Sequence, residues 1–371
     1  MRWRRALMVG GIGLFGTALL AAAAVCLGSG CSSLGFYAQA AGGHLDLLQR
    51  ARSVADAVAD PATPEALRQR LQLSQQMRDF AVRELQLPDN DSYRRYADLQ
   101  REAVVWNVVA APALGLTLKT WCFPVMGCVG YRGYFDQAQA QALAAQLRTE
   151  GWEVDVYGVP AYSTLGWSNW VGGDPLLNTF IRWPEGSLAQ LIFHELAHQV
   201  AYAPDDTTFN ESFAVAVERL GVQRWLAQPA SLSGRSPEEL ARVRLAFEQS
   251  EARRGDFRTL TLRYRVQLQA VYQSPAPEAE RLVRKAQVMA ALRADYETLK
   301  VQRWGGFNGY DSWVAKANNA SFGVQAAYNE LVPEFETLFE RQGRDFKAFY
   351  AAVQTLAGLP KDQRRAKLAT P

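Results

Sequence analysis

The segment that most restricts the fold is 191–199, which reads Leu-Ile-Phe-His-Glu-Leu-Ala-His-Gln. Residues four positions apart share a helix face, so a helix over 187–202 would place His194 and His198 side by side. The opposite face of that helix is apolar, with Phe193, Leu196 and Val200. The pattern therefore predicts a helix that is buried in a core and directs two imidazoles at one point.

Two imidazoles in this arrangement can hold one metal ion, and Glu195 lies about 100° round the helix from His194. Zinc lowers the pKa of a water molecule to about 7, and a neighbouring glutamate can pass the released proton to a leaving amine. The motif thus indicates metal-dependent hydrolysis. The alternative is two ordinary histidines on a helix, but two of only three histidines in the chain fall in this window.

A catalytic zinc ion needs a third protein ligand, and the remaining histidine, His44, lies far upstream. Glu211 is the favoured candidate, because Asn210 can cap the next helix and leave Glu211 in its first turn, facing back to the metal. Glu218 lies seven residues further along the same face. It could orient a ligand histidine or be the third ligand itself, and the alternative for both acids is a solvated position.

Charge argues against a nucleic-acid partner. Of the 371 residues, 40 are basic and 37 are acidic, and Arg2, Arg4 and Arg5 account for the whole excess. From Cys31 onward the chain is formally neutral, whereas a nucleic-acid-binding surface needs a basic patch. The hydrophobic content of 49% supplies material for a large core.

Residues 1–30 have the layout of a secretory signal peptide: a basic start, an uncharged apolar run over 6–27, and small residues before Cys31. A cysteine in this position resembles a lipoprotein cleavage site, so we expect Cys31 to carry lipid. The neutral Ser32 favours the outer membrane, with the body facing the periplasm. The alternative is an uncleaved anchor, since 22 residues can cross a bilayer core of about 30 Å.

Cys122 and Cys128 are the remaining cysteines of the exported body. In an oxidising compartment this pair is expected to close a small disulfide loop, and the alternative is two reduced, buried thiols. A structural zinc site is not expected here, because no further cysteine or nearby histidine could complete it.

The hydrophobic pattern predicts an α+β fold that is mostly helical, with a small mixed β-sheet before the histidine helix. We expect an N-terminal helical region (31–102), a β-rich subdomain with the histidine helix (103–204) and a C-terminal helical subdomain (205–371). One early helix should carry Leu47, Ala51, Val54 and Val58, and a second should run from Pro64 to about Leu85. Strands are expected at 104–109, 129–134 and 153–157. Further helices are expected at 136–150, 210–226, 237–254, 257–273, 277–300, 321–341 and 344–357.

His-Glu-x-x-His followed by Asn-Glu-x-Phe-Ala resembles the gluzincin metallopeptidases, which include the thermolysin and zinc aminopeptidase branches. Most of the exported chain also resembles a bacterial family of predicted aminopeptidases. The segments that carry this resemblance are Gly30-Cys31-Ser32-Ser33, Gly35-Phe36-Tyr37, Gly43-His44-Leu45-Asp46-Leu47-Leu48, Trp121-Cys122-Phe123-Pro124, Tyr131-Arg132-Gly133-Tyr134-Phe135, 159–167, 191–199, 209–214 and Asn318-Asn319-Ala320 ahead of Tyr328.

The resemblance implies a zincin-like fold and a peptidase with one zinc ion, anchored in the envelope and acting on peptides. Gluzincins usually draw a transition-state hydrogen-bond donor from a downstream tyrosine, which ranks Tyr310 and Tyr328 above Tyr162 and Tyr202. The Gly-x-Met-Glu-Asn segment by which many zinc aminopeptidases hold a free amine is absent. Exopeptidase and endopeptidase action therefore both stay open.

Two further sets of residues have a possible role in substrate binding. Tyr162-Ser163-Thr164 could line an edge strand that pairs with a peptide, and Asn318 and Asn319 could bind substrate backbone or cap a helix. The alternative to an enzyme is an envelope chaperone or scaffold lipoprotein whose zinc site is secondary or inactive.

The predicted anchor can be tested with Cys31→Ser. We expect the variant to lose fatty-acid labelling and to accumulate as a slower-migrating precursor or an uncleaved membrane form, because the thiol that accepts the lipid is gone. The measurement is metabolic labelling with a fatty acid, followed by electrophoresis. Identical labelling and processing of variant and parent would contradict the lipoprotein prediction.

Overall fold

The computed structural model describes residues 31–123, 127–161, 172–204, 206–229, 235–324 and 331–369. The expected signal peptide (1–30) therefore lies outside the described residues. Within those residues, no helix combines the length and the apolar character that a bilayer crossing requires.

The fold is α+β and mostly helical, as predicted. The strands are β1 (Arg52–Ser53), β2 (Arg95–Ala97), β3 (Val105–Ala111), β4 (Trp121–Phe123), β5 (Gly127–Val129), β6 (Arg132–Tyr134), β7 (Glu153–Val159) and β8 (Leu176–Leu177). The helices are α2 (Cys31–Arg50), α3 (Val54–Ala59), α4 (Glu65–Leu85), α5 (Gln137–Thr149), α6 (Glu185–Ala197), α7 (Thr207–Leu226), α9 (Pro237–Gln273), α10 (Glu278–Gln302), α11 (Asp311–Lys316), α12 (Asn319–Val324), α13 (Val332–Arg341), α14 (Phe346–Ala357) and α15 (Lys361–Ala369).

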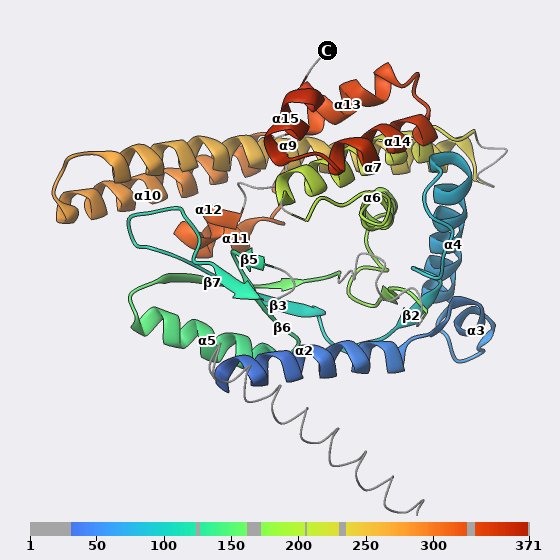
Figure 1. The fold of residues 1–371 in the computed structure, drawn as a ribbon, viewed down its shortest axis with the longest axis horizontal. Helices are drawn as coiled ribbons and strands as arrows, with labels where there is room; N and C mark the ends of the chain where they lie inside the picture. The colour runs from blue at the N-terminus through green and yellow to red at the C-terminus, as the bar shows by residue number, and fades with distance from the viewer. Residues whose placement is uncertain are drawn as a thin grey trace, which may run out of the picture.

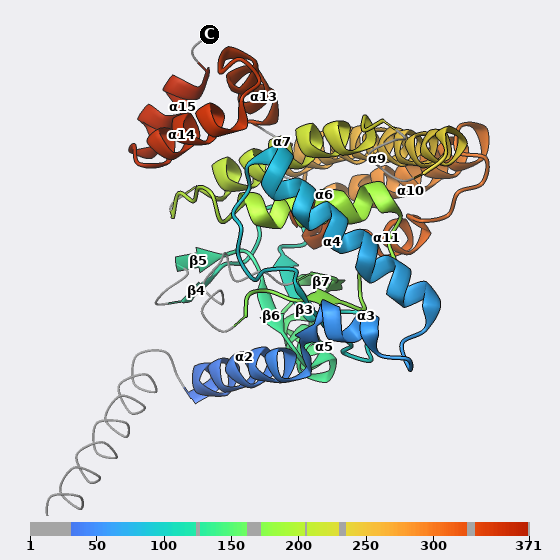
Figure 2. The same cartoon turned by 90° about the vertical axis from the view of Figure 1, so that its right-hand side faces the viewer.

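The elements stack in layers, which Figures 1 and 2 show from two sides. Helices α2 and α5 lie on one side of the strands, and α6, α7 and α9 lie on the other. Helices α13, α14 and α15 form an outer group beyond α7. One hydrophobic core runs through much of this stack and draws side chains from Leu47 to Leu368.

The sheet beside α6 has the order β6-β3-β7, and both pairings are antiparallel. Its central strand alternates: Val108 and Ala110 pack with α5, whereas Val109 and Ala111 pack with Ala320 of α12. The mixed sheet is a separate one, β1-β2-β8, in which β2 is antiparallel to β1 and parallel to β8. In the β4–β5 hairpin, Cys122 lies opposite Cys128 and a disulfide joins them.

Helices α6 and α7 are buried for different reasons. The core face of α6 is apolar, as the sequence predicted, and Phe193 and Leu196 are fully buried. Helix α7 is apolar on several sides, because α6 covers one face and α13 another. Gly221 of α7 permits the close approach: a Cβ atom there would lie 2.8 Å from Phe193 Cδ2 and 2.7 Å from Leu85 Cδ1.

Several predicted boundaries are wrong, each for a local reason. The early helix through Leu47 and Val58 is broken at 51–53, where β1 pairs with β2. The predicted strand 129–134 is divided between β5 and β6. The predicted helices 237–254 and 257–273 are one helix, α9, because Gly255 costs only about 1 kcal/mol inside a helix and the packing against α10 outweighs it.

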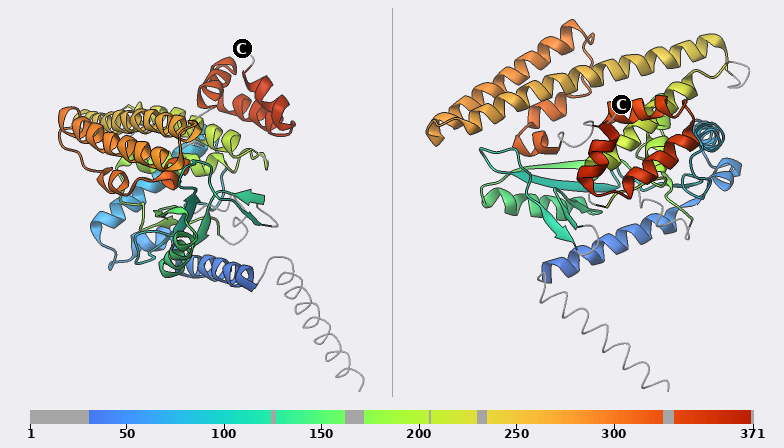
Figure 3. Two further views of the ribbon diagram at one scale, coloured as in Figure 1. Left: turned by 90° about the vertical axis from the view of Figure 1, so that its left-hand side faces the viewer. Right: turned by 45° about the horizontal axis from the view of Figure 1, so that its top comes forward.

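Helices α9 and α10 form a long antiparallel pair, which Figure 3 shows from two further directions. A buried polar cluster fixes this pair to the sheet. Lys285 of α10 donates to the Glu153 carboxylate and, at 2.8 Å, to the carbonyl of Ala113. The Asn319 side chain accepts from Tyr272 at 2.6 Å and donates to the carbonyls of Pro112 and Ala113. Asn319 therefore has a structural role, not the substrate contact considered from sequence.

Substitution of Gly221 tests the α6–α7 contact. Gly221→Ala should lower the free energy of unfolding by about 1–3 kcal/mol, because a methyl group in a filled core forces its neighbours apart. The matched control is Gly255→Ala in α9, where a Cβ atom meets nothing within 4 Å. The control should raise stability by about 0.5–1 kcal/mol. Denaturant unfolding measures both, and equal gains at the two sites would contradict the packing.

Candidate metal centre

Helix α6 brings His194 and His198 together at its C-terminal end. The two Nε2 atoms lie 3.1 Å apart, and the ring planes are nearly perpendicular at 83°. His198, the residue that caps α6, is 7% exposed, and His194 is half-buried. Both nitrogens therefore point into the same small volume, as the four-residue spacing predicted.

Glu211 of α7 completes the group. Its Oε2 atom lies 3.4 Å from His194 Nε2, and its Oε1 atom lies 3.8 Å from His198 Nε2. Ligand atoms of these three residues all lie within 4.8 Å of one another. Bonds of about 2.1 Å in a tetrahedral zinc site put neighbouring ligand atoms about 3.4 Å apart. The donor set of two imidazoles and a carboxylate therefore fits a single zinc-like ion.

The short connection between His198 and Glu211 is held by buried side chains. Asp206, not Asn210, caps α7, and it accepts a hydrogen bond from the Phe209 amide at 3.2 Å. The Asn210 side chain instead clamps the connection, bonding the amide of Ala203 at 2.8 Å and its carbonyl at 2.7 Å. The expected cap at Asn210 is thus wrong, because α7 begins one turn earlier.

Glu218 lies on the same face of α7 as Glu211 and contacts the other nitrogen of His194. Its Oε2 atom is 2.8 Å from Nδ1, and its side chain is 14% exposed. An imidazole that donates Nδ1–H to a carboxylate has its lone pair fixed on Nε2, facing the metal position. This contact matches the orienting role considered for Glu218.

The electrostatics of the metal-free group favour a bound cation. Burial lowers the pKa of His194, but hydrogen bonds to Glu211 and Glu218 outweigh it and hold the pKa well above its usual value. Burial and the neighbouring His194 charge lower the pKa of His198 to about 4. Burial alone would raise the pKa of Glu211, yet the hydrogen bond to His194 holds it below its usual value. A metal ion would displace the His194 proton and satisfy the same carboxylates.

A polar clamp holds the C-terminal end of α6 to the loop before β2. The Asn90 side chain donates to Gln199 Oε1 at 2.7 Å, and Gln199 Nε2 donates to Ser92 Oγ at 3.2 Å.

The residue after Ser92, Tyr93, is buried with a positive φ of 64°. Burial raises the pKa of Tyr93 well above its usual value, and the charge of Glu195 adds to the effect.

The charge of Glu211 influences Tyr131, which was not ranked among the candidate donors from sequence. Tyr131 lies directly before β6 and is 39% exposed. Partial burial raises the pKa of Tyr131, and the charges of Glu211 and Tyr202 add to the effect. Across the sheet, Asn107 donates to the Tyr157 hydroxyl at 3.3 Å, and the charge of Tyr131 also raises the pKa of Tyr157. The segment from Tyr131 to Phe135 carries part of the family resemblance, but its spacing gave no link between Tyr131 and Glu211.

The structure places the favoured donor Tyr310 in another hydrophobic core. Its ring stacks on Phe257 at 4.0 Å inside the α9–α11 core, and the charged groups that affect its pKa are Arg254, Glu251 and Arg253. The glycine-rich loop before it packs on α9, where the guanidinium carbon of Arg253 lies 4.5 Å from the centre of the Phe307 ring. Tyr328 and Tyr162-Ser163-Thr164 lie outside the described residues, and His44 lies on α2, outside the histidine–glutamate group.

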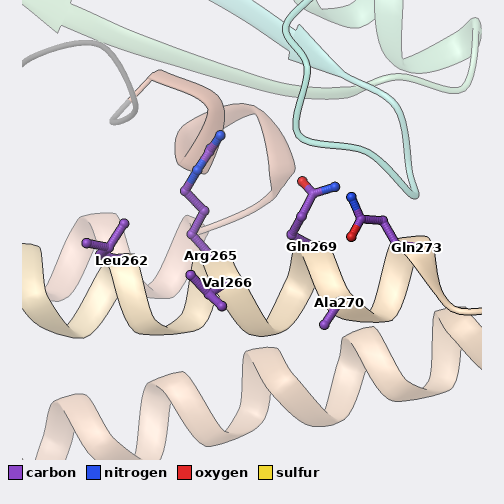
Figure 4. A pocket seen from close by; sticks show the side chains of 6 residues that line it. All are labelled: Leu262, Arg265, Val266, Gln269, Ala270 and Gln273. Atoms are coloured by element: carbon purple, nitrogen blue, oxygen red, sulfur yellow. The ribbon is translucent and has the colours of Figure 1, made fainter. Parts of the chain in front are cut away.

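Two surface cavities lie away from this group. One, of about 330 Å³, follows the exposed side of α9 and is lined by Leu262, Arg265, Val266, Gln269, Ala270 and Gln273 (Figure 4). Arg265 there donates to the carbonyl of Phe322 at 2.9 Å. The other, of about 360 Å³, lies between α2 and α4. Neither includes a residue of the histidine–glutamate group.

Comparison with known proteins gives one family. A family model described as "Putative aminopeptidase" matches residues 35–368, which is most of the chain. No curated protein and no solved structure matches significantly.

The two acids of α7 can be separated by metal binding. Glu211→Ala should reduce zinc affinity severely, because it removes one of three ligand side chains. Glu218→Ala should reduce it less, by about 10–100-fold, because it removes only the partner of His194 Nδ1. Metal content after dialysis against a weak chelator measures both. Loss of zinc from Glu218→Ala with retention in Glu211→Ala would reverse the assignment.

Proposed function

The chain belongs to the putative aminopeptidase family, and from this we propose that it is a zinc-dependent peptidase that hydrolyses peptide bonds in the bacterial periplasm. The observation that carries the proposal is the convergence of His194, His198 and Glu211 on one point. Two imidazoles and one carboxylate, with a further coordination position left open, form the donor set of catalytic zinc sites.

A bound zinc ion would supply a Lewis acid that polarises the scissile carbonyl and lowers the pKa of the attacking water. His194 and His198 would hold the ion through Nε2, and Glu211 through its carboxylate. Glu218 fixes the His194 ring by accepting a hydrogen bond at Nδ1. The carboxylate pair also balances the two positive charges of the ion in a largely buried setting.

Glu195 is the proton carrier in this proposal. It follows His194 on α6 and is half-buried beside the histidine pair. Its carboxylate takes a proton from water as the water oxygen bonds to the carbonyl carbon. It then gives that proton to the amide nitrogen as the carbon–nitrogen bond breaks. The second proton of the water also passes to the amine, so the products are a carboxylate and an ammonium group.

Tyr131 supplies the second donor to the developing oxyanion. Partial burial and the charge of Glu211 raise the pKa of Tyr131. A tyrosine hydroxyl is protonated at neutral pH even without such a shift, so it can donate a hydrogen bond. A fixed donor of this kind strengthens as negative charge forms on the carbonyl oxygen. Tyr131 lies upstream of α6, directly before β6, unlike the downstream tyrosines ranked from sequence.

Cellular location is part of the proposal. The signal layout of residues 1–30 and the lipid-accepting Cys31 would place the body on the periplasmic side of the outer membrane. Helix α2 begins at Cys31, so the folded body would start at the anchor.

The central test is Glu195→Gln. The variant should bind zinc like the parent but lose nearly all hydrolysis, because an amide cannot take a proton from water. His194→Ala and His198→Ala should lose zinc as well as activity. Amino-acid and dipeptide anilides, with free and with acetylated amines, measure turnover and show whether a free amine is required.

Two results would contradict the proposal. Parental turnover in Glu195→Gln would exclude this glutamate as the proton carrier. A zinc content near zero in parent protein purified without chelator would favour the scaffold alternative.

Tyr131→Phe removes only a hydroxyl and tests the second donor. We expect kcat to fall about 10²–10³-fold with little change in KM or zinc content, because the lost hydrogen bond belongs to the transition state. Tyr310→Phe is the matched control, since its hydroxyl lies in a different core, and it should keep parental kcat. Equal kcat in the two variants would remove Tyr131 from the mechanism.

A further inference from the structure

A fully buried carboxylate lies in the connection between the two helices of the metal centre. Asp206 has a side-chain exposure of 0%. It follows His198 by eight residues and precedes Glu211 by five. Its Oδ1 atom accepts from the Phe209 amide at 3.2 Å, and its carbonyl accepts from the Asn210 amide at 3.1 Å. Asp206 thus determines where α7 begins.

Three cationic side chains lie close to this carboxylate, and all three belong to α15. Arg364 Nη1 lies 3.1 Å from Oδ2, Arg365 Nη2 lies 3.4 Å from Oδ1, and Lys361 Nζ lies 3.9 Å from Oδ1. Arg364 is itself 2% exposed. A carboxylate withdrawn from water is tolerated only with such partners, so loss of one leaves an uncompensated buried charge.

Arg364 also joins α15 to two other helices. Its guanidinium donates to the carbonyl of Leu359 at 2.8 Å and to that of Ala357 at 3.3 Å, at the end of α14. The guanidinium carbon lies 5.2 Å from the centre of the Phe209 ring on α7. Arg364 therefore fixes the first turn of α7 against α14 and α15 at the same time.

The first turn of α7 matters because Glu211 lies immediately after it. Unsupported helix ends fray, since the first amides have no partners within the helix. A ligand carboxylate must be held within about 0.5 Å of its productive position. Fraying at Asp206 would move Glu211 away from the histidines, although no residue of α15 touches the metal position.

We propose that α15 is a positioning element of the metal centre, in which Arg364 acts through Asp206 to hold Glu211 in place. The metal-affinity part rests on the proposed zinc site, but the fixing of the α7 start does not. The last helix of the chain thus sets metal affinity without contributing a ligand.

The experiment compares Arg364→Met with Lys285→Met in the full-length protein. Both remove a buried cation, but Lys285 anchors α10 to the sheet and does not contact α6 or α7. Arg364→Met should raise the Kd for zinc about 10–100-fold, as expected when an outer partner of a ligand is lost. Lys285→Met should lose stability and keep its zinc Kd within about twofold of the parent, as expected for a purely structural cation.

Amide hydrogen exchange gives a readout that does not need zinc. In the metal-free protein, Arg364→Met should exchange the amides of 207–211 at least tenfold faster than the parent, with α4 unchanged, because the opening is local. A uniform rise across the core, or parental exchange at 207–211, would overturn the proposal. So would a parental zinc Kd in folded Arg364→Met.

A second variant keeps the proposal testable if Arg364→Met does not fold. If Arg364→Met does not fold, Arg365→Met removes a cation that is 33% exposed, and a several-fold rise in zinc Kd with faster exchange at 207–211 is expected. Parental values in Arg365→Met would then overturn the proposal. A parent that binds no zinc would contradict the proposed function, while the exchange at 207–211 would still decide whether α15 holds the start of α7.

Discussion

The packing of α6 against α7 is the contact on which the candidate site depends. Phe193 and Gly221 allow the two helix axes to approach closely, so that His194 lies between Glu211 and Glu218. Two glutamates seven residues apart on α7 therefore reach both nitrogens of one imidazole. A larger residue at Gly221 would separate the helices and the two glutamates from His194.

This arrangement places His194 and two carboxylates together in a largely buried position, where proteins seldom hold charged groups. Without a metal, the pKa of His194 is raised and the pKa of His198 is lowered. A proton is therefore held by His194 in preference to His198. A divalent cation would replace the proton on His194 Nε2 and pair with Glu211, while Glu218 keeps its contact with Nδ1. Binding would then stabilise the folded protein by mass action, as for any ligand of the native state alone.

The C-terminal helices also support the candidate site, although they contribute no candidate ligand. Aromatic rings of Phe335, Phe349 and Tyr350 pack around Phe213 on the outer side of α7, and α15 neutralises Asp206 at its start. Tyr350 also donates to the carbonyl of Leu85 at 2.9 Å, which connects this group to α4. The helix with Glu211 is thus held from its outer side as well as by α6.

The sequence alone determined those features that depend on local periodicity. The four-residue spacing of His194 and His198, the apolar back of α6 and the seven-residue spacing of Glu211 and Glu218 follow from helix geometry. Features that depend on non-local packing were decided by the tertiary structure. Asp206 can be buried at the start of α7 because α15 supplies its counter-charges, and α9 passes through Gly255 because α10 supports it. Tyr310 lies in the core of α9 and α11 because its ring stacks on Phe257, a contact that one-dimensional spacing does not encode.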